Sequence, residues 1–267
     1  MNAGESRLKK FFGWLTRQRL PVAEIQIRRP KFEAAALTVF AFLYILLSYC
    51  TGLLILRWPA PVLGAASFTH SAWYIFLFKI FALLTVPLVM FRWWGYGVRV
   101  LLLDWKPTPQ RVTWAVVAFL LGFSLNLGHL ERIGEASARY STGEFTLRIA
   151  LAVLLPLFMA GLPEEIVYRG LLQTRLEAVC GRIVALIVTA VLFTAWHLPT
   201  RYLLAHGVEG EAGNFGSVVL GTGLPVFVVG LIFGLIWDRN RRLVPLIAAH
   251  WGVDLLPTVS SMLGVDF

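Results

Sequence analysis

The chain consists of long apolar runs separated by short polar segments. Seven runs come near or exceed the ~18–20 apolar residues that cross a bilayer as a helix. Apolar and polar residues do not alternate along these runs, which excludes the short alternating strands of a membrane β-barrel. The pattern predicts an all-α fold, a polytopic transmembrane helical bundle of seven helices, or eight if 92–110 holds a helix at the membrane surface. The expected spans are roughly 33–56, 70–91, 111–130, 146–163, 183–203, 216–237 and 243–264.

The composition favours a membrane-embedded chain. Of the 267 residues, 58% are hydrophobic and only 15% are charged, whereas a soluble globular domain is about half apolar and about a quarter charged. The two cysteines, Cys50 and Cys180, lie in or beside different runs, so neither a disulfide framework nor a cysteine metal site is expected. The chain is therefore expected to be an integral membrane protein that contacts the lipid bilayer.

Positive charge is distributed unevenly between the two expected sides of the bundle. The segments 1–31, 92–111, 164–182 and 238–242 hold 18 of the 24 Lys and Arg residues, the outer segments that alternate with them hold five, and Lys79 lies within the expected span 70–91. Because cytoplasmic loops carry an excess of Lys and Arg, the N-terminus is predicted to be cytoplasmic and the C-terminus external. The net charge of +9 then indicates topology and contact with anionic lipid, and no nucleic-acid partner is expected.

Residues 1–31 form a basic cytoplasmic or interfacial segment in this scheme. Its eight Lys and Arg residues are interspersed with aromatic residues such as Phe11, Phe12 and Trp14. Such a segment either lies flat on an anionic membrane surface or serves only as a cytoplasmic tail that sets the topology. Residues 32–267 are expected to form the transmembrane helical domain.

Two adjacent carboxylates, Glu164 and Glu165, follow the fourth apolar run. On a helix, Glu165 and Arg169 stand four residues apart and are expected to pair. Glu164 points about 100° away and is left for chemistry. In a soluble helix the same string is usually a solvated face, but ionisable groups at membrane depth are costly and are usually paired or functional. One long helix over about 146–179 is expected to carry Glu164 into the membrane interior.

Further ionisable residues lie inside the later runs. His197 is deep in the fifth span, and Phe193 is one turn earlier on the same face. In the last span, His250 and Asp254 lie four residues apart on one face. A lone membrane histidine is more often a packing residue. Two histidines, an aspartate and a Glu-Glu/Arg cluster on three spans are most cheaply accommodated around a shared water-filled interior.

These residue types favour hydrolysis by activated water. No serine or cysteine stands beside a base, so a covalent nucleophile is not indicated. A glutamate and a histidine together can deprotonate water, and a second histidine with Asp254 can stabilise an oxyanion. The set Glu164, His197 and His250 can also hold zinc with an open coordination position. The zinc string H-E-x-x-H is absent.

The series E-E-x-x-x-R, F-x-x-x-H and H-x-x-x-[N/D] over residues 146–257 resembles the CPBP intramembrane proteases, which include type II CAAX prenyl endopeptidases and bacterial relatives that process bacteriocins or confer immunity. The resemblance implies a helical bundle around a cavity open to the cytoplasmic side. It also implies that Glu164 and His197 activate water and that His250 and Asp254 stabilise the oxyanion, with Glu165, Arg169 and Phe193 in support. Relatives are described both as glutamate-type and as metal-dependent enzymes.

Asp254 departs from the asparagine that this family often has, and a carboxylate donates a hydrogen bond only when it is protonated. The leading interpretation is an intramembrane endopeptidase that cleaves a membrane-associated peptide or protein in a prokaryotic inner membrane. The alternative is a non-proteolytic membrane protein, either a transporter or an immunity or scaffold protein that keeps the polar pocket, because intramembrane carboxylates and histidines also serve proton relays.

Overall fold

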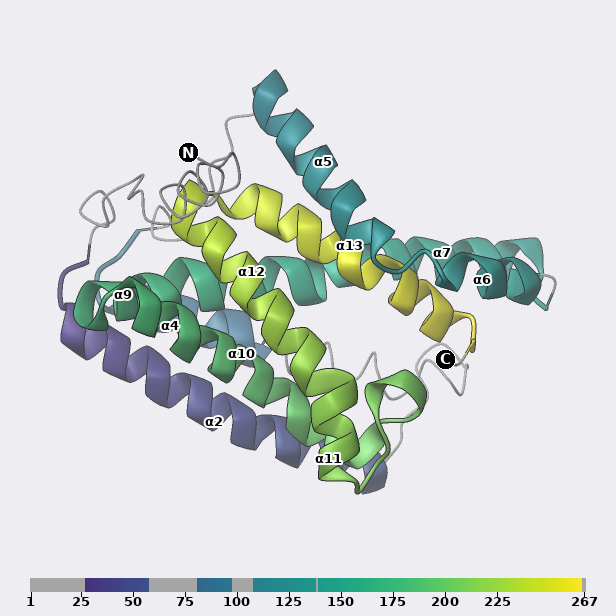
Figure 1. The fold of residues 1–267 in the computed structure, drawn as a ribbon, viewed down its shortest axis with the longest axis horizontal. Coiled ribbons are helices and arrows are strands. Elements are labelled where there is room, and N and C mark those ends of the chain that lie inside the picture. Colours follow the sequence, from purple (N-terminus) through teal and green to yellow (C-terminus); the bar gives the residue numbers. More distant parts are fainter. Residues whose placement is uncertain (1–26, 58–80, 98–107, 138, 266–267) are drawn as a thin grey trace, which may run out of the picture.

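A computed structural model of the chain describes residues 27–57, 81–97, 108–137 and 139–265 (Figure 1). Every regular element within these ranges is a helix, which confirms the all-α prediction. The α-helices are α2 (Pro30–Arg57), α4 (Val86–Trp93), α5 (Pro109–Ser124), α6 (His129–Ser137), α7 (Thr142–Pro156), α8 (Leu162–Glu164), α9 (Thr174–Cys180), α10 (Arg182–Leu204), α11 (Phe215–Val218), α12 (Leu224–Asn240) and α13 (Leu243–Met262). Between them lie the π-helical segments η4 (Leu157–Gly161), η5 (Glu165–Gln173) and η7 (Val219–Gly223) and the 3₁₀ turn η6 (Gly207–Glu209).

In the described ranges, five continuous helices are long and apolar enough to cross a membrane. They confirm the predicted spans 33–56, 146–163, 183–203, 216–237 and 243–264. Their bounds are Pro30–Arg57, Thr142–Cys180, Arg182–Leu204, Phe215–Arg239 and Leu243–Met262. The predicted span 70–91 lies mostly outside the described residues, and its described end belongs to a shorter apolar helix, Phe81–Trp93.

The predicted span over 111–130 is a bent pair of helices and not one continuous helix. Helix α5 ends at Ser124, and α6 begins at His129 after a bend of 80°. The turn between them contains Asn126 and Gly128, residue types that favour turns because of their local hydrogen bonding and backbone freedom. The apolar pattern continues through this turn, so periodicity alone did not reveal the break.

One helix runs through 39 residues from Thr142 to Cys180, as the long helix predicted over 146–179 requires. At 1.5 Å per residue it is about 58 Å long, well beyond the ~30 Å hydrocarbon core of a bilayer. Two π-helical segments, η4 and η5, lie within this helix, one on each side of the short α8. Pro156 and Pro163 each remove a backbone N–H from this stretch, so the hydrogen-bond pattern changes where the candidate carboxylates lie.

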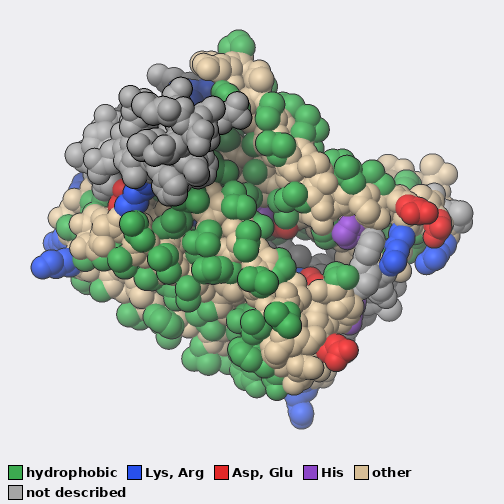
Figure 2. Space-filling model, in the orientation of Figure 1, with side chains coloured by type: hydrophobic (Ala, Val, Ile, Leu, Met, Phe, Trp, Pro, Cys, Tyr) green, Lys and Arg blue, Asp and Glu red, His purple; other side chains and the backbone are tan. Residues whose placement is uncertain are grey.

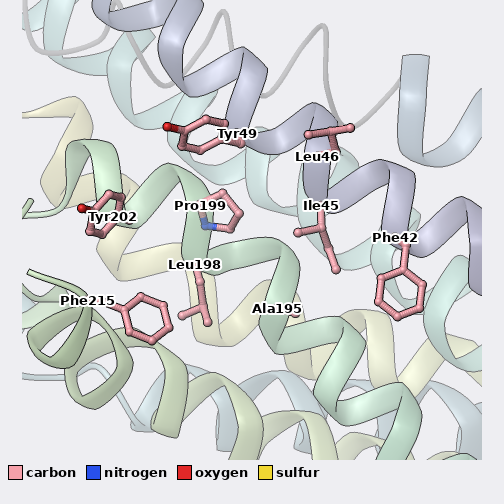
Figure 3. A pocket seen from close by; sticks show the side chains of 9 residues that line it. All are labelled: Phe42, Ile45, Leu46, Tyr49, Ala195, Leu198, Pro199, Tyr202 and Phe215. Atoms are coloured by element: carbon pink, nitrogen blue, oxygen red, sulfur yellow. The ribbon is translucent and has the colours of Figure 1, made fainter. Parts of the chain in front are cut away.

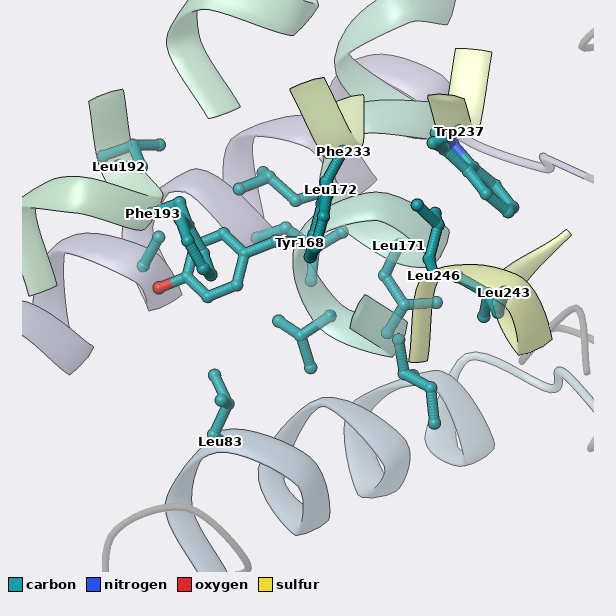
Figure 4. Packing of buried hydrophobic residues seen from close by; sticks show 14 of the residues in the cluster. Leu83, Tyr168, Leu171, Leu172, Leu192, Phe193, Phe233, Trp237, Leu243 and Leu246 are labelled. Atoms are coloured by element: carbon teal, nitrogen blue, oxygen red, sulfur yellow. The ribbon is translucent and has the colours of Figure 1, made fainter. Parts of the chain in front are cut away.

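The buried apolar core surrounds η5 (Figure 4). Tyr168, Leu171 and Leu172 of η5 are almost inaccessible to solvent. They belong to one cluster with Phe193 of α10 and Trp237 of α12. The segment that carries the candidate carboxylates is therefore at the centre of the bundle and is enclosed by α10, α12 and α13.

Two glycines bring α12 close to α10 and η5. A Cβ atom built on Gly234 would lie 2.4 Å from Leu186 Cδ1, and one built on Gly230 would lie 3.4 Å from Phe193 Cδ1. The close approach also allows a hydrogen bond from the η5 side, in which Gln173 Nε2 donates to the Gly234 carbonyl at 3.0 Å. The Gly230-x-x-x-Gly234 spacing thus serves close helix packing, as small-residue spacings do in membranes.

Polar contacts join the start of α2, the segment after α4 and helix α9 at one end of the bundle. The Tyr96 hydroxyl donates to Glu33 Oε1 at 2.5 Å, and Arg175 Nε donates to Glu33 Oε2 at 3.3 Å. Burial raises the pKa of Tyr96, and the hydrogen bond to Glu33 adds to that rise. At the same end of the bundle, Arg241 pairs with Glu177 of α9. The described parts of three segments predicted to share one side of the membrane, 92–111, 164–182 and 238–242, therefore meet beside the start of α2.

Candidate active site

Glu165 and Arg169 form a buried ion pair. Arg169 Nη1 lies 3.1 Å from Glu165 Oε1, and both side chains are fully inaccessible to solvent. Arg169 also donates through Nη2 to the Gly230 carbonyl at 3.4 Å, and its guanidinium lies 4.2 Å from the Phe193 ring centroid. The predicted pairing is confirmed. A buried charge needs such partners because its desolvation is costly.

Three carboxylates converge on His250. Its Nδ1 lies 2.8 Å from Glu165 Oε1, the oxygen that also accepts from Arg169. Its Nε2 lies 3.4 Å from Asp254 Oδ2 and 3.7 Å from Glu164 Oε2. A carboxylate paired with a guanidinium is an acceptor, so Nδ1 of His250 carries a hydrogen atom. The Nε2 edge of the ring therefore faces Glu164 and Asp254.

The orientation of His197 is set by its own helix. Its Nδ1 lies 2.7 Å from the Phe193 carbonyl oxygen, one turn earlier in α10. A carbonyl only accepts hydrogen bonds, so the hydrogen atom is on Nδ1, and Nε2 of the neutral ring keeps its lone pair. The ring is half-buried, and its centroid lies 3.8 Å from that of Trp196.

Phe193 lies between the two histidines. Its ring centroid is 5.0 Å from that of His197 and 6.2 Å from that of His250, in edge-on arrangements. Tyr168 of η5 packs edge-on against the same ring at 5.1 Å. Phe193 therefore contacts the side chains of α10, η5 and α13 that carry the candidate chemistry, which fits the supporting role predicted for it.

The carboxylates occupy the junction between α8 and η5, where Glu164 ends the α-helix and Glu165 begins the π-helical segment. π-helical turns inside α-helices are rare and are found frequently at functional sites. Side chains further along the helix hydrogen-bond to carbonyls of η5. Thr174 Oγ1 donates to the Arg169 carbonyl at 3.0 Å, and Arg175 Nη1 donates to the Gly170 carbonyl at 3.1 Å.

The solvent exposure of the side chains in the cluster decreases from Asp254 through His250 to Glu164. The Asp254 side chain is 35% exposed, against 8% for His250 and 1% for Glu164. Figure 2 shows the surface hollowed between α13 and the α11 end of α12, with acidic and histidine side chains at the rim. Glu164 and His250 are thus largely screened from solvent, while Asp254 is the accessible member of the group.

A separate apolar groove lies on the other side of α10, between α2 and α10 (Figure 3). It has a volume of about 670 Å³, and Leu198 and Pro199, which follow His197, are part of its wall. The remaining wall is Phe42, Ile45, Leu46, Tyr49, Ala195, Tyr202 and Phe215. The candidate catalytic residues do not line this groove.

The possible zinc set does not fit the geometry. Among the described residues, no group of three or more His, Cys, Asp or Glu side chains is arranged to hold a metal ion. The prediction that Glu164, His197 and His250 can serve as ligands for zinc is therefore not supported. Glu165 instead joins Glu164 and Asp254 around His250.

Several residues of the cluster did not stand out in the sequence. Phe233 packs edge-on against His250 with ring centroids 5.6 Å apart, and its ring also lies 5.6 Å from the Arg169 guanidinium. The contact of Glu165 with His250 joins residues 85 positions apart. The Gly230-x-x-x-Gly234 spacing was the available signal for this part of α12, because close packing there brings Phe233 to the site.

One of three comparisons with known proteins finds a similarity, and it covers the C-terminal half of the chain up to residue 256. Residues 146–256 match a family model described as type II CAAX prenyl endopeptidase Rce1-like. The match contains α8, η5, α10, α12 and most of α13, and so all seven predicted site residues. No curated protein and no solved structure matches the chain.

Proposed function

We propose that the chain is an intramembrane endopeptidase that hydrolyses a peptide bond by activating water, from the premise that residues 146–256 match the type II CAAX prenyl endopeptidase Rce1-like family. The family match supports the CAAX protease class and a peptide or protein substrate. The observation that carries the proposal further is the convergence of Glu164, Glu165 and Asp254 on His250 inside the helical bundle.

Glu164 is the proposed general base. Its carboxylate is buried at the start of the π-helical segment and faces the Nε2 edge of His250. It takes a proton from a water molecule as the water oxygen forms a bond to the carbonyl carbon of the substrate. His197 offers Nε2 as a second acceptor that orients this water, because its Nδ1–H is engaged by the Phe193 carbonyl. Collapse of the tetrahedral intermediate returns the proton to the leaving amine and breaks the C–N bond.

His250 and Asp254 form the proposed oxyanion side. Glu165 accepts from Nδ1–H of His250, so Nε2 is directed toward Glu164 and Asp254. In the imidazolium form, which carries a hydrogen atom on both ring nitrogens, Nε2–H is the donor at the place where the substrate carbonyl oxygen would acquire charge. A donor that is fixed before the reaction stabilises the developing oxyanion without reorganisation. Asp254 lies beside this oxygen position and assists when its carboxyl is protonated.

The proposed substrate is a membrane-associated peptide or protein. Five helices in the described ranges are able to cross a membrane, and the catalytic residues are enclosed by them, so the substrate segment must enter from the bilayer or from its surface. The charge pattern supports a cavity on the cytoplasmic side of the membrane, and the compact size and the family resemblance favour a prokaryotic inner membrane. In the same scheme, residues 1–31 contact that surface through their basic side chains; only 27–31 of this segment lie among the described residues.

The decisive experiment compares Glu164→Gln with Glu135→Gln, a matched control because Glu135 is exposed on α6. Both proteins are reconstituted in nanodiscs with a membrane-anchored reporter peptide, and cleavage products are identified by mass spectrometry. The rate is expected to fall by roughly 10²–10⁴ for Glu164→Gln, because the amide cannot act as the base. Parental cleavage by Glu164→Gln would contradict the assignment. Proton-coupled transport without cleavage by the parent would favour the transporter alternative.

A further inference from the structure

Helix α5 precedes the family-matched residues but contacts the helix that carries His250 and Asp254. It packs along α13 and crosses it (Figure 1). The crossing occurs at Gly122 of α5 and Gly252 of α13, and Gly252 lies midway between His250 and Asp254 in the sequence. The backbones of the two helices thus meet beside the candidate oxyanion residues.

The approach at this crossing leaves no space for a side chain on either helix. A Cβ atom built on Gly122 would lie 2.2 Å from the Ala249 carbonyl oxygen, and one built on Gly252 would lie 2.2 Å from the Phe119 carbonyl oxygen. Both obstructing atoms are backbone atoms, so no rotamer change can relieve the clash. Even a methyl group at either glycine must therefore move one helix relative to the other.

A second contact between these elements depends on a proline. Pro257 lies inside α13 and has no N–H, so the Val253 carbonyl four residues earlier lacks its usual helical donor. Asn126, in the turn after α5, fills this position by donating from Nδ2 to the Val253 oxygen at 2.7 Å. This carbonyl directly precedes Asp254. The turn that replaced the expected straight span therefore supplies a specific hydrogen bond to α13.

On the side away from α5, helix α13 is held by the long helix, and one of these contacts is made by Trp251, next to Gly252. Trp251 Nε1 donates to the Val153 carbonyl of α7 at 2.7 Å. Gly161 of η4 also approaches α13, since a Cβ atom there would lie 2.9 Å from the Ile247 carbonyl oxygen. Residues 247–253 of α13 are thus held between the long helix and α5, and α5 forms one of the two walls.

We propose that α5 and the turn after it are a positioning element for the active site, with Gly122 and Asn126 as positioning residues. Together they fix how far α13 is shifted along its axis and rotated about it, and so they place His250 and Asp254 against Glu164 and Glu165. The consequence for catalysis rests on the proposed protease function. The geometric part of the proposal is independent of that function.

The test uses the full chain in nanodiscs and follows the position of His250 directly. Histidine labelled with ¹³C in the ring gives resonances from five residues, and His250→Gln identifies the one from His250. The variants are Gly122→Ala and Asn126→Leu. The control is Gly128→Ala, at an exposed glycine whose added Cβ would meet no atom within 4 Å. We expect Gly122→Ala and Asn126→Leu to shift the His250 resonance while that of His197 stays in place, and Gly128→Ala to change neither.

Activity gives the second readout. Misplacement of reacting groups by about 1 Å can cost roughly 10²-fold, so Gly122→Ala is expected to lower kcat strongly while KM changes little. The double variant Asn126→Leu/Pro257→Ala restores a helical N–H for the Val253 carbonyl and is expected to recover part of the kcat lost in Asn126→Leu. Unchanged His250 resonances in both Gly122→Ala and Asn126→Leu would overturn the proposal. A parent that cleaves no reporter peptide would contradict the protease function alone, because the resonance test still decides the positioning role.

Discussion

His250 Nδ1 and Glu165 Oε1 lie 2.8 Å apart, although the two residues are 85 positions apart in the chain. The same carboxylate oxygen is 3.1 Å from Arg169 Nη1. The ion pair that ties η5 together is therefore also the contact that fixes the imidazole of α13. The stability of the fold and the position of His250 therefore both depend on the Glu165 carboxylate.

Arg169→Ala is expected to lower both folded yield and activity. Removal of the guanidinium leaves Glu165 as a buried carboxylate without its opposite charge, and breaking a buried pair costs roughly 3–5 kcal/mol. Thermal unfolding in detergent measures the loss. The control is Arg92→Ala, because Arg92 is exposed at the end of α4. Equal unfolding temperatures for Arg169→Ala and the parent would show that this pair does not support the fold.

Asp254→Asn is expected to retain activity or to increase it. The amide keeps the size of the side chain and supplies an N–H next to His250 Nε2, which lies 3.4 Å from the present carboxylate. Asp254→Leu removes any donor, and loss of one oxyanion donor costs about 10²–10³ in rate. Steady-state kinetics on the reporter peptide distinguish the two. Strong inactivation by the amide would indicate that the ionised carboxylate is needed to orient His250.

Phe193→Leu is expected to reduce kcat more than it raises KM. The ring separates His197 from His250 and covers the Arg169 guanidinium at 4.2 Å, so a smaller side chain loosens all three groups. The matched control is Phe158→Leu, at a phenylalanine of η4 whose side chain is 50% exposed. Similar kinetics for the two variants would remove Phe193 from the supporting residues.

Dialysis against a chelator is expected to leave cleavage unchanged. The described His, Cys, Asp and Glu side chains do not form a group suited to a metal ion, and the carboxylates around His250 are engaged with that ring and with Arg169. Activity and metal content are measured on the same sample before and after dialysis. Loss of activity that stoichiometric zinc restores would contradict the water activation proposed for Glu164 and His197.

Topology reporters fused at residues 100 and 240 are expected to report a cytoplasmic position, and those at residues 62 and 210 an external one. The reason is the excess of Lys and Arg in the segments that contain 100 and 240. The ion pair between Arg241 and Glu177 joins two of these segments. Reversed signals at both pairs would place the accessible side of the site on the opposite face of the membrane.

Local spacing was sufficient to predict the contacts within a single helix. Glu165 and Arg169, like His250 and Asp254, are four residues apart, and both pairs form in the structure. Contacts between helices were less accessible, because spacing gives the face of a residue but not the partner of that face. The approach of Glu165 to His250 and the role of Asn126 depend on how α5, η5 and α13 pack. The bend after Ser124 was missed because apolar residues continue through a turn that Asn126 and Gly128 favour.

The π-helical segments η4 and η5 also constrain how the chain tolerates insertions and deletions. A π turn accommodates one extra residue within an α-helix, and each residue of an α-helix advances the side chain by about 100°. Deleting one residue within Leu157–Gly161 while restoring a regular helix would therefore leave Glu164 and Glu165 on nearly the same face relative to α7, whereas adding one residue to a regular α-helical turn before them would rotate them by about 100° away from His250. The two π segments are therefore the places where this long helix takes up or loses a residue with least effect on the face that carries the carboxylates, while a change of length in its regular α-helical turns would move them away from His250.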